Sequence, residues 1–379
     1  MNRNIGLDII RSFAIILVLI CHGITIFYNP RFYSQTTSDF LENTSAVTGL
    51  FGVELFFILS GFLIGRILIK DILPAKSWSA LKVFYIRRWF RTLPLYYLMV
   101  LGFFVVTGRT HYWENLFFIQ NLNEEHLDKF PVSWSLSVEE WFYLLIPVLF
   151  IIARKVFNNE KKAFFIICFS IIFIELSARV GYTLLEDPTF NQDIRKQVHF
   201  RLDSLMIGVL LAGINVYYKK AYNSIARSKS LFIFSSLILS SGLIYMFLIN
   251  NDIDSSFFAK TFYFTLNSIF IAFVLAYCES SKRLNNINSK IFNKLIYIIS
   301  ITSYASYLIH VYIFRAISKF SFNYISNWII LLLTWLFAVI IVIFVSYLVY
   351  KYFEKPIMKY RDKITLDQPK NPEKESLAG

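Results

Sequence analysis

Long apolar stretches separated by short polar connections make up most of this chain. The stretches that are long enough to cross a bilayer lie near residues 8–28, 47–69, 89–108, 134–153, 163–185, 200–217, 230–249, 260–278, 295–316 and 327–350. A bilayer-spanning helix needs about 20 mostly apolar residues. We therefore predict an all-α membrane protein with about ten transmembrane helices. An even number of spans places both termini on the same side.

The basic residues divide unequally between the connections on the two sides. If the N-terminus is cytoplasmic, the inward connections and the C-terminal tail hold most of the 38 Lys and Arg residues. The outward connections hold Arg31, Arg109, Lys129, Arg195, Lys196, Lys260 and Lys319. By the positive-inside rule this asymmetry predicts that both termini are cytoplasmic. The formal charge of +13 is then a topology signal, and we expect no nucleic-acid partner.

Composition points to the lipid bilayer as the surroundings of the whole chain. Hydrophobic residues make up 56% of the sequence and the mean hydropathy is +0.54, against about 45–50% hydrophobic residues in soluble domains. We expect an integral membrane domain over residues 1–362 and a disordered cytoplasmic tail over residues 363–379. The first apolar stretch is not a typical signal peptide, because Asp8 and Arg11 interrupt it and no small-residue cleavage site follows.

Arg11 and His22 lie in the same apolar segment, and this pair is the most informative feature of the sequence. An Arg at the centre of a bilayer helix costs about 2.5–3.5 kcal/mol, so it marks a functional site by default. Eleven residues are almost three helical turns, which places both side chains on one face about 16 Å apart. One face of this segment therefore carries a fixed cation and a titratable base.

The other polar residues of the apolar segments form two layers. The predicted outer layer contains His22, Glu54, Glu139, Glu140, Arg201, Asp203 and His310, and the layer nearer the cytoplasm contains Arg11, Ser60, Arg66, Arg88 and Arg91. Taken singly, charges near helix ends can extend to the interface, and Arg201 with Asp203 can form a simple interfacial pair. Together, seven ionisable groups at one depth indicate a shared water-accessible cavity.

Seven short blocks, in order along the chain, carry a resemblance to a known family. They begin at Leu7 (LDIIR, followed by His22), Gly52 (GVELFFILSGFLI), Arg87 (RRWFRTLP), Trp134 (WSLSVEEWFY), Arg201 (RLDS), Ser303 (SYASYLIH) and Phe353 (FEKP). From about residue 5 to residue 360 the chain resembles the acyltransferase-3 family of integral membrane acyltransferases.

This resemblance implies transfer of an acyl group, usually acetyl, from coenzyme A to a hydroxyl of an extracytoplasmic carbohydrate or lipid-linked glycan. We accordingly expect a multi-pass protein of the bacterial cytoplasmic membrane. The family's arginine-to-histidine motif in the first helix corresponds to Arg11 and His22. Its R-x-x-R motif corresponds to Arg88 and Arg91.

The chain departs from the family pattern at two positions. Glu54 stands where Asp is often found, and Trp141 stands where Gln is common. Either change can reshape the surroundings of the base. Many relatives also carry a soluble extracytoplasmic hydrolase-like domain, whereas this sequence ends within 30 residues of its last apolar segment. We therefore expect the protein to act alone or to pass the acyl group to a separate protein.

A donor site for acetyl-CoA follows from the inner layer as a hypothesis. The residues assigned to it are Arg11, Ser60, Arg66, Arg88 and Arg91. Arg88 and Arg91 can bind phosphates through their forked guanidinium groups, with Arg66 in support. Arg11 would then hold the pyrophosphate or the middle of the donor. The distance of about 16 Å to His22 resembles the reach of an extended pantetheine arm.

The outer layer supplies the expected chemistry. His22 would act as general base on the acceptor hydroxyl, or as the nucleophile. Glu139 or Glu54 would orient its imidazole, as the third residue does in a catalytic triad. The candidates for the acceptor site are Glu140, Arg201, Asp203 and His310. We expect no metal, since the five histidines show no ligand spacing.

Two other functions remain open. A multi-span exporter or flippase of a glycan would also line a path with polar layers, although neither inverted repeats nor Gly- or Pro-broken helices are evident. An enzyme with a larger acyl donor such as succinyl-CoA, or with a macrolide or lipid acceptor, has the same sequence pattern.

Overall fold

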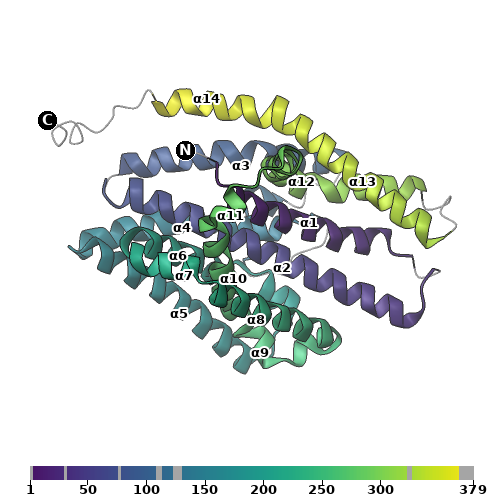
Figure 1. Ribbon diagram of the computed structural model, residues 1–379, viewed down its shortest axis with the longest axis horizontal. Coiled ribbons are helices and arrows are strands. Elements are labelled where there is room, and N and C mark those ends of the chain that lie inside the picture. Colours follow the sequence, from purple (N-terminus) through teal and green to yellow (C-terminus); the bar gives the residue numbers. More distant parts are fainter. Residues whose placement is uncertain are drawn as a thin grey trace.

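The computed structural model describes residues 3–29, 32–75, 78–107, 113–122, 130–321 and 327–366. Within these ranges the chain is helical and contains no β-strand. Figure 1 shows the long helices side by side across the picture, with the start of the first helix and the end of the last toward the same end. This part of the chain is therefore the all-α bundle that the apolar pattern predicts.

The chain up to Tyr217 contains six of the helices. They are α1 (Ile5–Phe27), α2 (Gln35–Ile67), α3 (Trp78–Thr107), α4 (Ser133–Val156), α5 (Glu160–Glu186) and α6 (Leu202–Tyr217). Short segments between them are the π-helical η2 (Leu68–Ile72) and η4 (Phe190–Arg195) and the 3-10 helices η3 (Trp113–Phe117) and η5 (Val198–Phe200).

From Lys219 onward the described chain contains eight further α-helices, some of them a single turn long. They are α7 (Lys219–Arg227), α8 (Lys229–Leu248), α9 (Phe257–Lys260), α10 (Tyr263–Ser280), α11 (Lys282–Asn285), α12 (Lys290–Ser321), α13 (Trp328–Val349) and α14 (Lys355–Leu366). The 3-10 helix η6 (Asn250–Ser255) precedes α9, and the π-helical η7 (Tyr350–Glu354) joins α13 to α14.

Eight helices of the described residues are long and apolar enough to cross a membrane. Each of the ten expected spans falls largely within a helix, but the helices at 89–108 and 200–217 are not among the eight. The second of these, α6, has 16 residues and a length of about 24 Å, which is shorter than a hydrocarbon core of about 30 Å. The count of ten therefore stays a prediction.

Polar side chains fix where several long helices begin. Asn4 Oδ1 accepts a hydrogen bond of 3.0 Å from the backbone N–H of Leu7 at the start of α1. Asn159 and Ser228 cap α5 and α8 in the same way. Such caps satisfy backbone donors that have no partner inside the helix. These three capping residues precede apolar stretches and set where α1, α5 and α8 begin.

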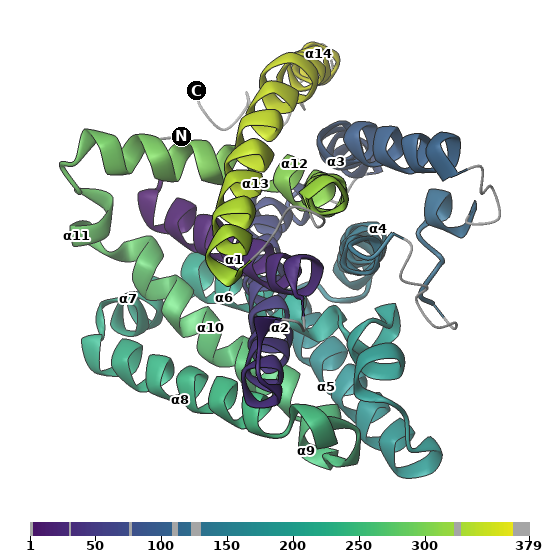
Figure 2. The ribbon, with the colours of Figure 1, turned by 90° about the vertical axis from the view of Figure 1, so that its right-hand side faces the viewer.

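Helix α2 is the centre of the bundle (Figure 2). In its most apolar window, 72% of the residues are buried inside the protein. It approaches α6 closely at Gly61 and Gly208: a Cβ at Gly208 would collide with the backbone of Ile58 and Phe62, and a Cβ at Gly61 would collide with the carbonyl of Leu205. This contact brings Glu54 on α2 next to the start of α6.

Helices α13 and α14 form one continuous rod through η7. The stretch Trp328–Thr365 has 38 residues and a length of about 57 Å, almost twice the hydrocarbon thickness of about 30 Å. Its C-terminal part packs beside α3, where Arg361 Nη1 donates a hydrogen bond of 3.3 Å to the carbonyl of Arg87. Because α14 continues to Leu366, the first four residues of the tail expected from residue 363 are helical. The tail residues 367–379 lie outside the described residues.

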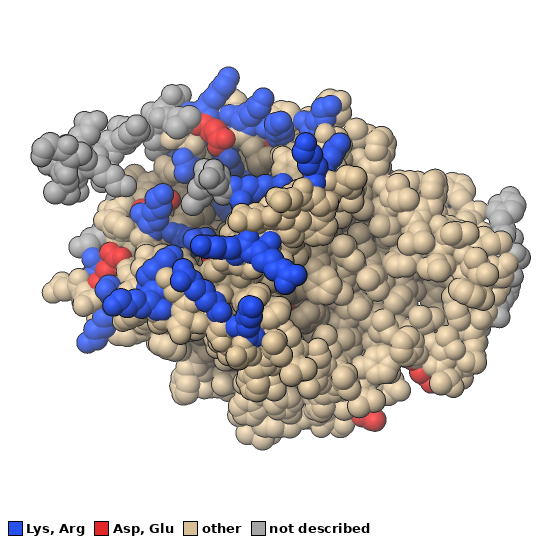
Figure 3. Space-filling model, in the orientation of Figure 1, with Lys and Arg blue, Asp and Glu red and all other residues tan. Residues whose placement is uncertain are grey.

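Lysine and arginine side chains gather at one end of the molecule (Figure 3). It is the end at which α14 finishes, and the opposite end shows no basic side chain in this view. The positive-inside rule expects such a distribution when the basic end is cytoplasmic. The cytoplasmic placement of the termini remains a prediction.

Candidate active site

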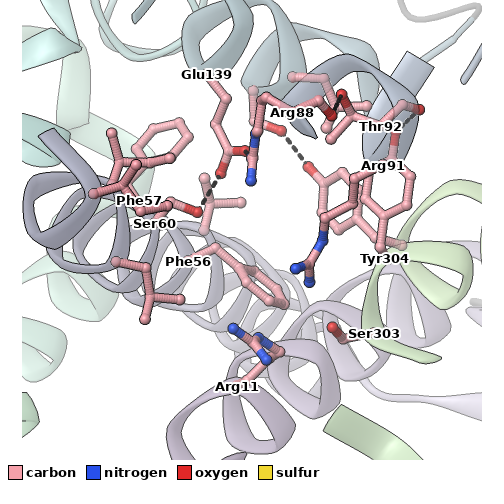
Figure 4. Close-up of a pocket in the computed structure, with 17 residues that line it drawn as sticks. Arg11, Phe56, Phe57, Ser60, Arg88, Arg91, Thr92, Glu139, Ser303 and Tyr304 are labelled. Atoms are coloured by element: carbon pink, nitrogen blue, oxygen red, sulfur yellow. Dashed lines mark hydrogen bonds and ion pairs between the residues drawn. The ribbon is translucent and has the colours of Figure 1, made fainter. Parts of the chain in front are cut away.

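A polar cavity of about 170 Å³ lies where α1, α2, α3, α4 and α12 meet. Five residues that the sequence assigned to the site line it: Arg11, Ser60, Arg88, Arg91 and Glu139 (Figure 4). Hydroxyl groups of Thr92, Ser135, Ser303, Tyr304 and Tyr307 face the same space. Residues from five separate helices therefore converge on one cavity, which is lined by most of the residues expected in the donor site.

Glu139 is held inside this cavity by three neighbours. Its Oε1 accepts a hydrogen bond of 3.1 Å from Ser60, and its Oε2 accepts one of 2.9 Å from the hydroxyl of Tyr143. Arg88 Nη2 lies 3.2 Å from the same Oε2 and also hydrogen-bonds Tyr143, over whose ring the guanidinium sits at 3.8 Å. Glu139 thus neutralises and orients Arg88. Among the described residues it forms no hydrogen bond or ion pair with His22, although the sequence-based hypothesis gave it the role of orienting that imidazole.

Arg11 has one long ion pair, and Arg91 has none among the described residues. Arg11 lies 3.9 Å from Asp8, whose carboxylate also accepts from Arg3 at 2.5 Å and from Ser300 at 2.5 Å. Within the described part of the chain, Arg91 makes neither a hydrogen bond nor an ion pair with another side chain. Figure 4 shows Arg11, Arg88 and Arg91 approaching the cavity from different sides. A cavity with three guanidinium groups and one carboxylate attracts anions.

A second cavity of about 650 Å³ adjoins the first on the basic side of the molecule. We call it the basic vestibule; its charged lining comprises Arg87, Arg88, Arg91, Arg361, Asp71 and Asp362. It shares Ile64, Ile67, Arg88 and Arg91 with the first cavity. The two cavities form a basic passage from the lysine-rich end into the bundle. The contribution of Arg361 was not foreseen, because nothing in the sequence shows that α14 packs beside α3.

His22 and His310 form a pair at the other end of α1. Their ring centroids are 4.8 Å apart and the rings meet edge to face at 68°. His22 Nδ1 lies 3.1 Å from the carbonyl of Val18, and His310 Nδ1 lies 2.9 Å from that of Ser306. Because a carbonyl only accepts hydrogen bonds, each Nδ1 carries the proton and each Nε2 presents a lone pair. His310 Nε2 is buried without a hydrogen-bond partner among the described residues.

Tyr307 separates the cavity from the histidine pair. Its hydroxyl lies 2.5 Å from Ser135 Oγ, and its ring centroid lies 6.1 Å from that of His310. Tyr307 and Ser135 both line the cavity. The eleven residues from Arg11 to His22 cover about 16 Å along α1, as expected, and Tyr307 lies between the two levels.

Glu54 and Arg201 form a buried ion pair with each other. Glu54 is 2% exposed and Arg201 is fully buried, and Arg201 Nη2 donates to Glu54 Oε1. Ser204 and Ser268 donate to Glu54 Oε2 at 3.0 and 3.4 Å. In the structure Glu54 therefore pairs with Arg201 and does not orient His22. The pair ties α2 to α6 and α10 where the glycine contact brings these helices together.

Asp203 is also paired inside the bundle, with Arg179. The sequence analysis did not identify Arg179 as a site residue. Arg179 Nη2 lies 2.8 Å from Asp203 Oδ2, and Thr265 donates to the same oxygen at 2.6 Å. Arg179 also donates to the carbonyls of Thr261 and Phe200. A signal was available, because Arg179 interrupts the apolar stretch 163–185. Arg201 is thus paired with Glu54 and Asp203 with Arg179, and neither pair includes His310.

Arg66 and Glu140 lie outside the first cavity. Arg66 lies 3.3 Å from Glu279 on α10 and 3.4 Å from Asn215 Oδ1, so it is separated from Arg88 and Arg91. Glu140 accepts a hydrogen bond of 2.9 Å from Thr92, whose own side chain faces the cavity. The sequence placed Arg66 in the inner layer and Glu140 in the outer layer by depth alone. In the structure neither side chain faces the first cavity.

The long apolar helices, the arginine-lined cavity and the histidine pair are those of a multi-pass membrane protein with a basic internal cavity. Comparison with family models matches residues 4–351 to the acyltransferase domain of the acyltransferase-3 type. The chain therefore belongs to this family of membrane acyltransferases, as the seven sequence blocks predicted.

Individual relatives match different lengths of the chain. An uncharacterized protein of Haemophilus influenzae is 33% identical over 227 residues, which are 53% of this chain and 89% of that protein. A protein of Listeria monocytogenes named peptidoglycan O-acetyltransferase OatA is 28% identical over 48% of this chain and 29% of its own length. A putative O-acetyltransferase of Staphylococcus aureus is 28% identical over 93% of this chain and 57% of its own length. The chain thus spans about a third and a little over half of the two named relatives. No solved structure matches the chain.

Proposed function

We propose that this chain is a membrane O-acetyltransferase that moves an acetyl group from cytosolic acetyl-CoA to a hydroxyl of an extracytoplasmic carbohydrate or lipid-linked glycan. The observation that carries the proposal is the basic passage that leads from the lysine-rich end to the layer below His22. The names of the Listeria and Staphylococcus relatives support O-acetyl transfer, and their bacterial origin supports a place in the bacterial cytoplasmic membrane.

The donor would enter through the basic vestibule. Coenzyme A carries several phosphate charges, which suit a passage lined by Arg87, Arg91 and Arg361. Arg91 is the best candidate for direct contact, because its guanidinium has no side-chain partner among the described residues. Arg11 lies further along the same path, and Arg88 is already neutralised by Glu139. An extended pantetheine arm would then cover the distance of about 16 Å to the level of His22.

His22 would act as general base on the acceptor. Its Nε2 takes the proton of the acceptor hydroxyl while the hydroxyl oxygen forms a bond to the thioester carbonyl carbon. The carbonyl electron pair moves to oxygen and returns when the C–S bond breaks. The thiolate of coenzyme A leaves and receives the proton from His22, so that an ester and free coenzyme A result. His22 as an acylated nucleophile remains the alternative.

His310 would bind the acceptor beside His22. Its unpartnered Nε2 is a hydrogen-bond acceptor in a buried position, where an unsatisfied polar atom costs about 1–3 kcal/mol. A second hydroxyl of the carbohydrate would satisfy it and align the reacting hydroxyl with His22. This role keeps His310 as the one acceptor-site candidate that lies next to the proposed base.

Membrane vesicles with the cytoplasmic face outward test the proposal. Radiolabelled acetyl-CoA in the bath should be consumed, and label should appear on glycan in the lumen. Vesicles of the opposite orientation should not use the same donor, and vesicles carrying His22→Ala serve as the control for the chemistry. Transport of unmodified glycan with acetyl-CoA left intact would instead identify an exporter. Consumption of succinyl-CoA in preference to acetyl-CoA would correct the donor.

A further inference from the structure

Arg195 is a cation at the histidine end that the sequence counted only as a topology signal. It is the last residue of η4, a six-residue π-helical segment between α5 and α6. Short π-helical segments occur frequently at functional sites, because they displace a side chain from its regular helical position. Here the segment directs Arg195 from an outer connection into the bundle.

The guanidinium of Arg195 lies between helices that also form the site. It sits 5.3 Å from the ring centroid of Trp134 on α4, and its Nη1 donates a hydrogen bond of 3.2 Å to Asn191 in the same segment. Its Nη2 is 3.9 Å from where a Cβ at Gly49 of α2 would lie. The same position lies 2.5 Å from Sγ of Cys21, the residue that precedes His22 on α1, so the guanidinium lies near the histidine end of α1.

No carboxylate balances the charge of Arg195. In the described ranges it forms no ion pair, and its hydrogen-bond partner Asn191 is neutral. Glu54, which interacts with it electrostatically, is already bound by Arg201. A guanidinium stays protonated at neutral pH. Its side chain is partly exposed, unlike those of Arg179 and Arg201, so a ligand can reach it.

The outer wall of the donor cavity leads to this position. Phe57 lines the cavity and meets Trp134 edge to face at 6.2 Å between ring centroids. Tyr307 lines the cavity and adjoins His310. A thioester that passes this wall toward His22 would therefore also approach the guanidinium of Arg195, which lies against Trp134.

We propose that Arg195 binds the carbonyl oxygen of the acyl group and stabilises the oxyanion that forms when the acceptor attacks. The proposal rests on the acyl transfer proposed above and adds a catalytic residue to it. In that step the carbonyl electron pair moves onto oxygen as the new C–O bond forms, and it returns as the C–S bond breaks. A fixed cation placed where this charge develops stabilises the transition state more than the bound thioester.

The test compares Arg195→Gln with the wild-type protein in lipid nanodiscs, with release of the coenzyme A thiol as the readout. Loss of an oxyanion donor lowers kcat by about 10²–10³-fold. The KM for acetyl-CoA should change little, because the phosphates bind Arg91 and Arg11. Arg195→Lys, which keeps the charge, should recover part of kcat. A merely structural residue would not give this division between kcat and KM.

Arg315→Gln is the matched control. Arg315 is an exposed cation on α12 that also interacts electrostatically with His22, so its removal reports the effect of charge at a distance. It should leave kcat near the wild-type value. An equal fall in kcat in both Gln variants, or an unchanged kcat in Arg195→Gln, overturns the proposal.

If Arg195→Gln does not fold, the variant Asn191→Ala tests the proposed role of Arg195 instead. Asn191 is exposed, and its loss removes the hydrogen bond that holds the guanidinium. A lower kcat at unchanged KM supports the proposal, and an unchanged kcat overturns it. If the wild-type protein releases no thiol from acetyl-CoA with any acceptor, the acyl-transfer function itself fails, which is a different result.

Discussion

Replacing Glu54 by Gln should destabilise the protein without removing its donor site. Arg201 is fully buried, and its Nη2 has two hydrogen-bond partners, Glu54 and Ser204. Its Nε and Nη1 already lack partners among the described residues. Removing one partner of a buried ion pair costs about 3–5 kcal/mol, because the other charge stays buried. Contact with the ring of Phe264, 3.6 Å from the guanidinium carbon, offsets a part of this.

Detergent titration followed by tryptophan fluorescence measures the loss. A change of about 3–5 kcal/mol shifts the unfolding equilibrium by roughly two to four powers of ten. The double variant Glu54→Leu with Arg201→Met is the control, since exchanging a whole buried pair for apolar residues is often neutral or stabilising. Binding of acetyl-CoA to the folded fraction should be retained. A stable Glu54→Gln protein that binds its donor but has lost acyl transfer would refute the reasoning and return Glu54 to the catalytic site.

The remaining predictions concern the chemistry and the donor. His22→Ala should abolish acyl transfer while the protein accumulates in membranes at normal levels; near-normal acetylation by this variant would remove His22 from catalysis. Arg91→Lys should weaken acetyl-CoA binding measured by calorimetry, because an ammonium cannot replace a bidentate guanidinium. Arg88→Lys should weaken binding and also loosen Glu139. Unchanged affinity in both lysine variants would place the phosphate site elsewhere.

The sequence placed Glu139 in the outer layer, but in the structure it binds Ser60 and Arg88 of the inner layer, and the direction of each side chain was harder still to assign. The positions of Arg11 and His22 on one segment give their separation along α1 directly. Glu54 and Ser60 are six residues apart, which turns them about 120° away from each other around α2. Ser60 accordingly faces Glu139, and Glu54 faces Arg201. The helical period alone was therefore sufficient to place these two residues on different faces.

Contacts between distant segments could not be predicted in this way. His310 was placed at the depth of His22, but the contact between their rings depends on α12 packing against α1. Arg361 follows all the apolar segments and reaches the basic vestibule because α14 continues the rod of α13 back beside α3. No periodicity encodes which helix covers a given face, since any apolar face can pack against another.

The arginines inside this bundle fall into two groups, those that are paired with a carboxylate of the protein and those that are not. Arg179 and Arg201 are fully buried, each bound to a carboxylate, and a charge that is neutralised in this way holds helices together. Arg91 and Arg195 have no carboxylate bound to them among the described residues, and both are open to a cavity or partly exposed. A cation that the protein leaves without a carboxylate can pair with an anion that a ligand supplies. The phosphates of the donor at Arg91 and the developing oxyanion at Arg195 would provide that anion at the two ends of the same path.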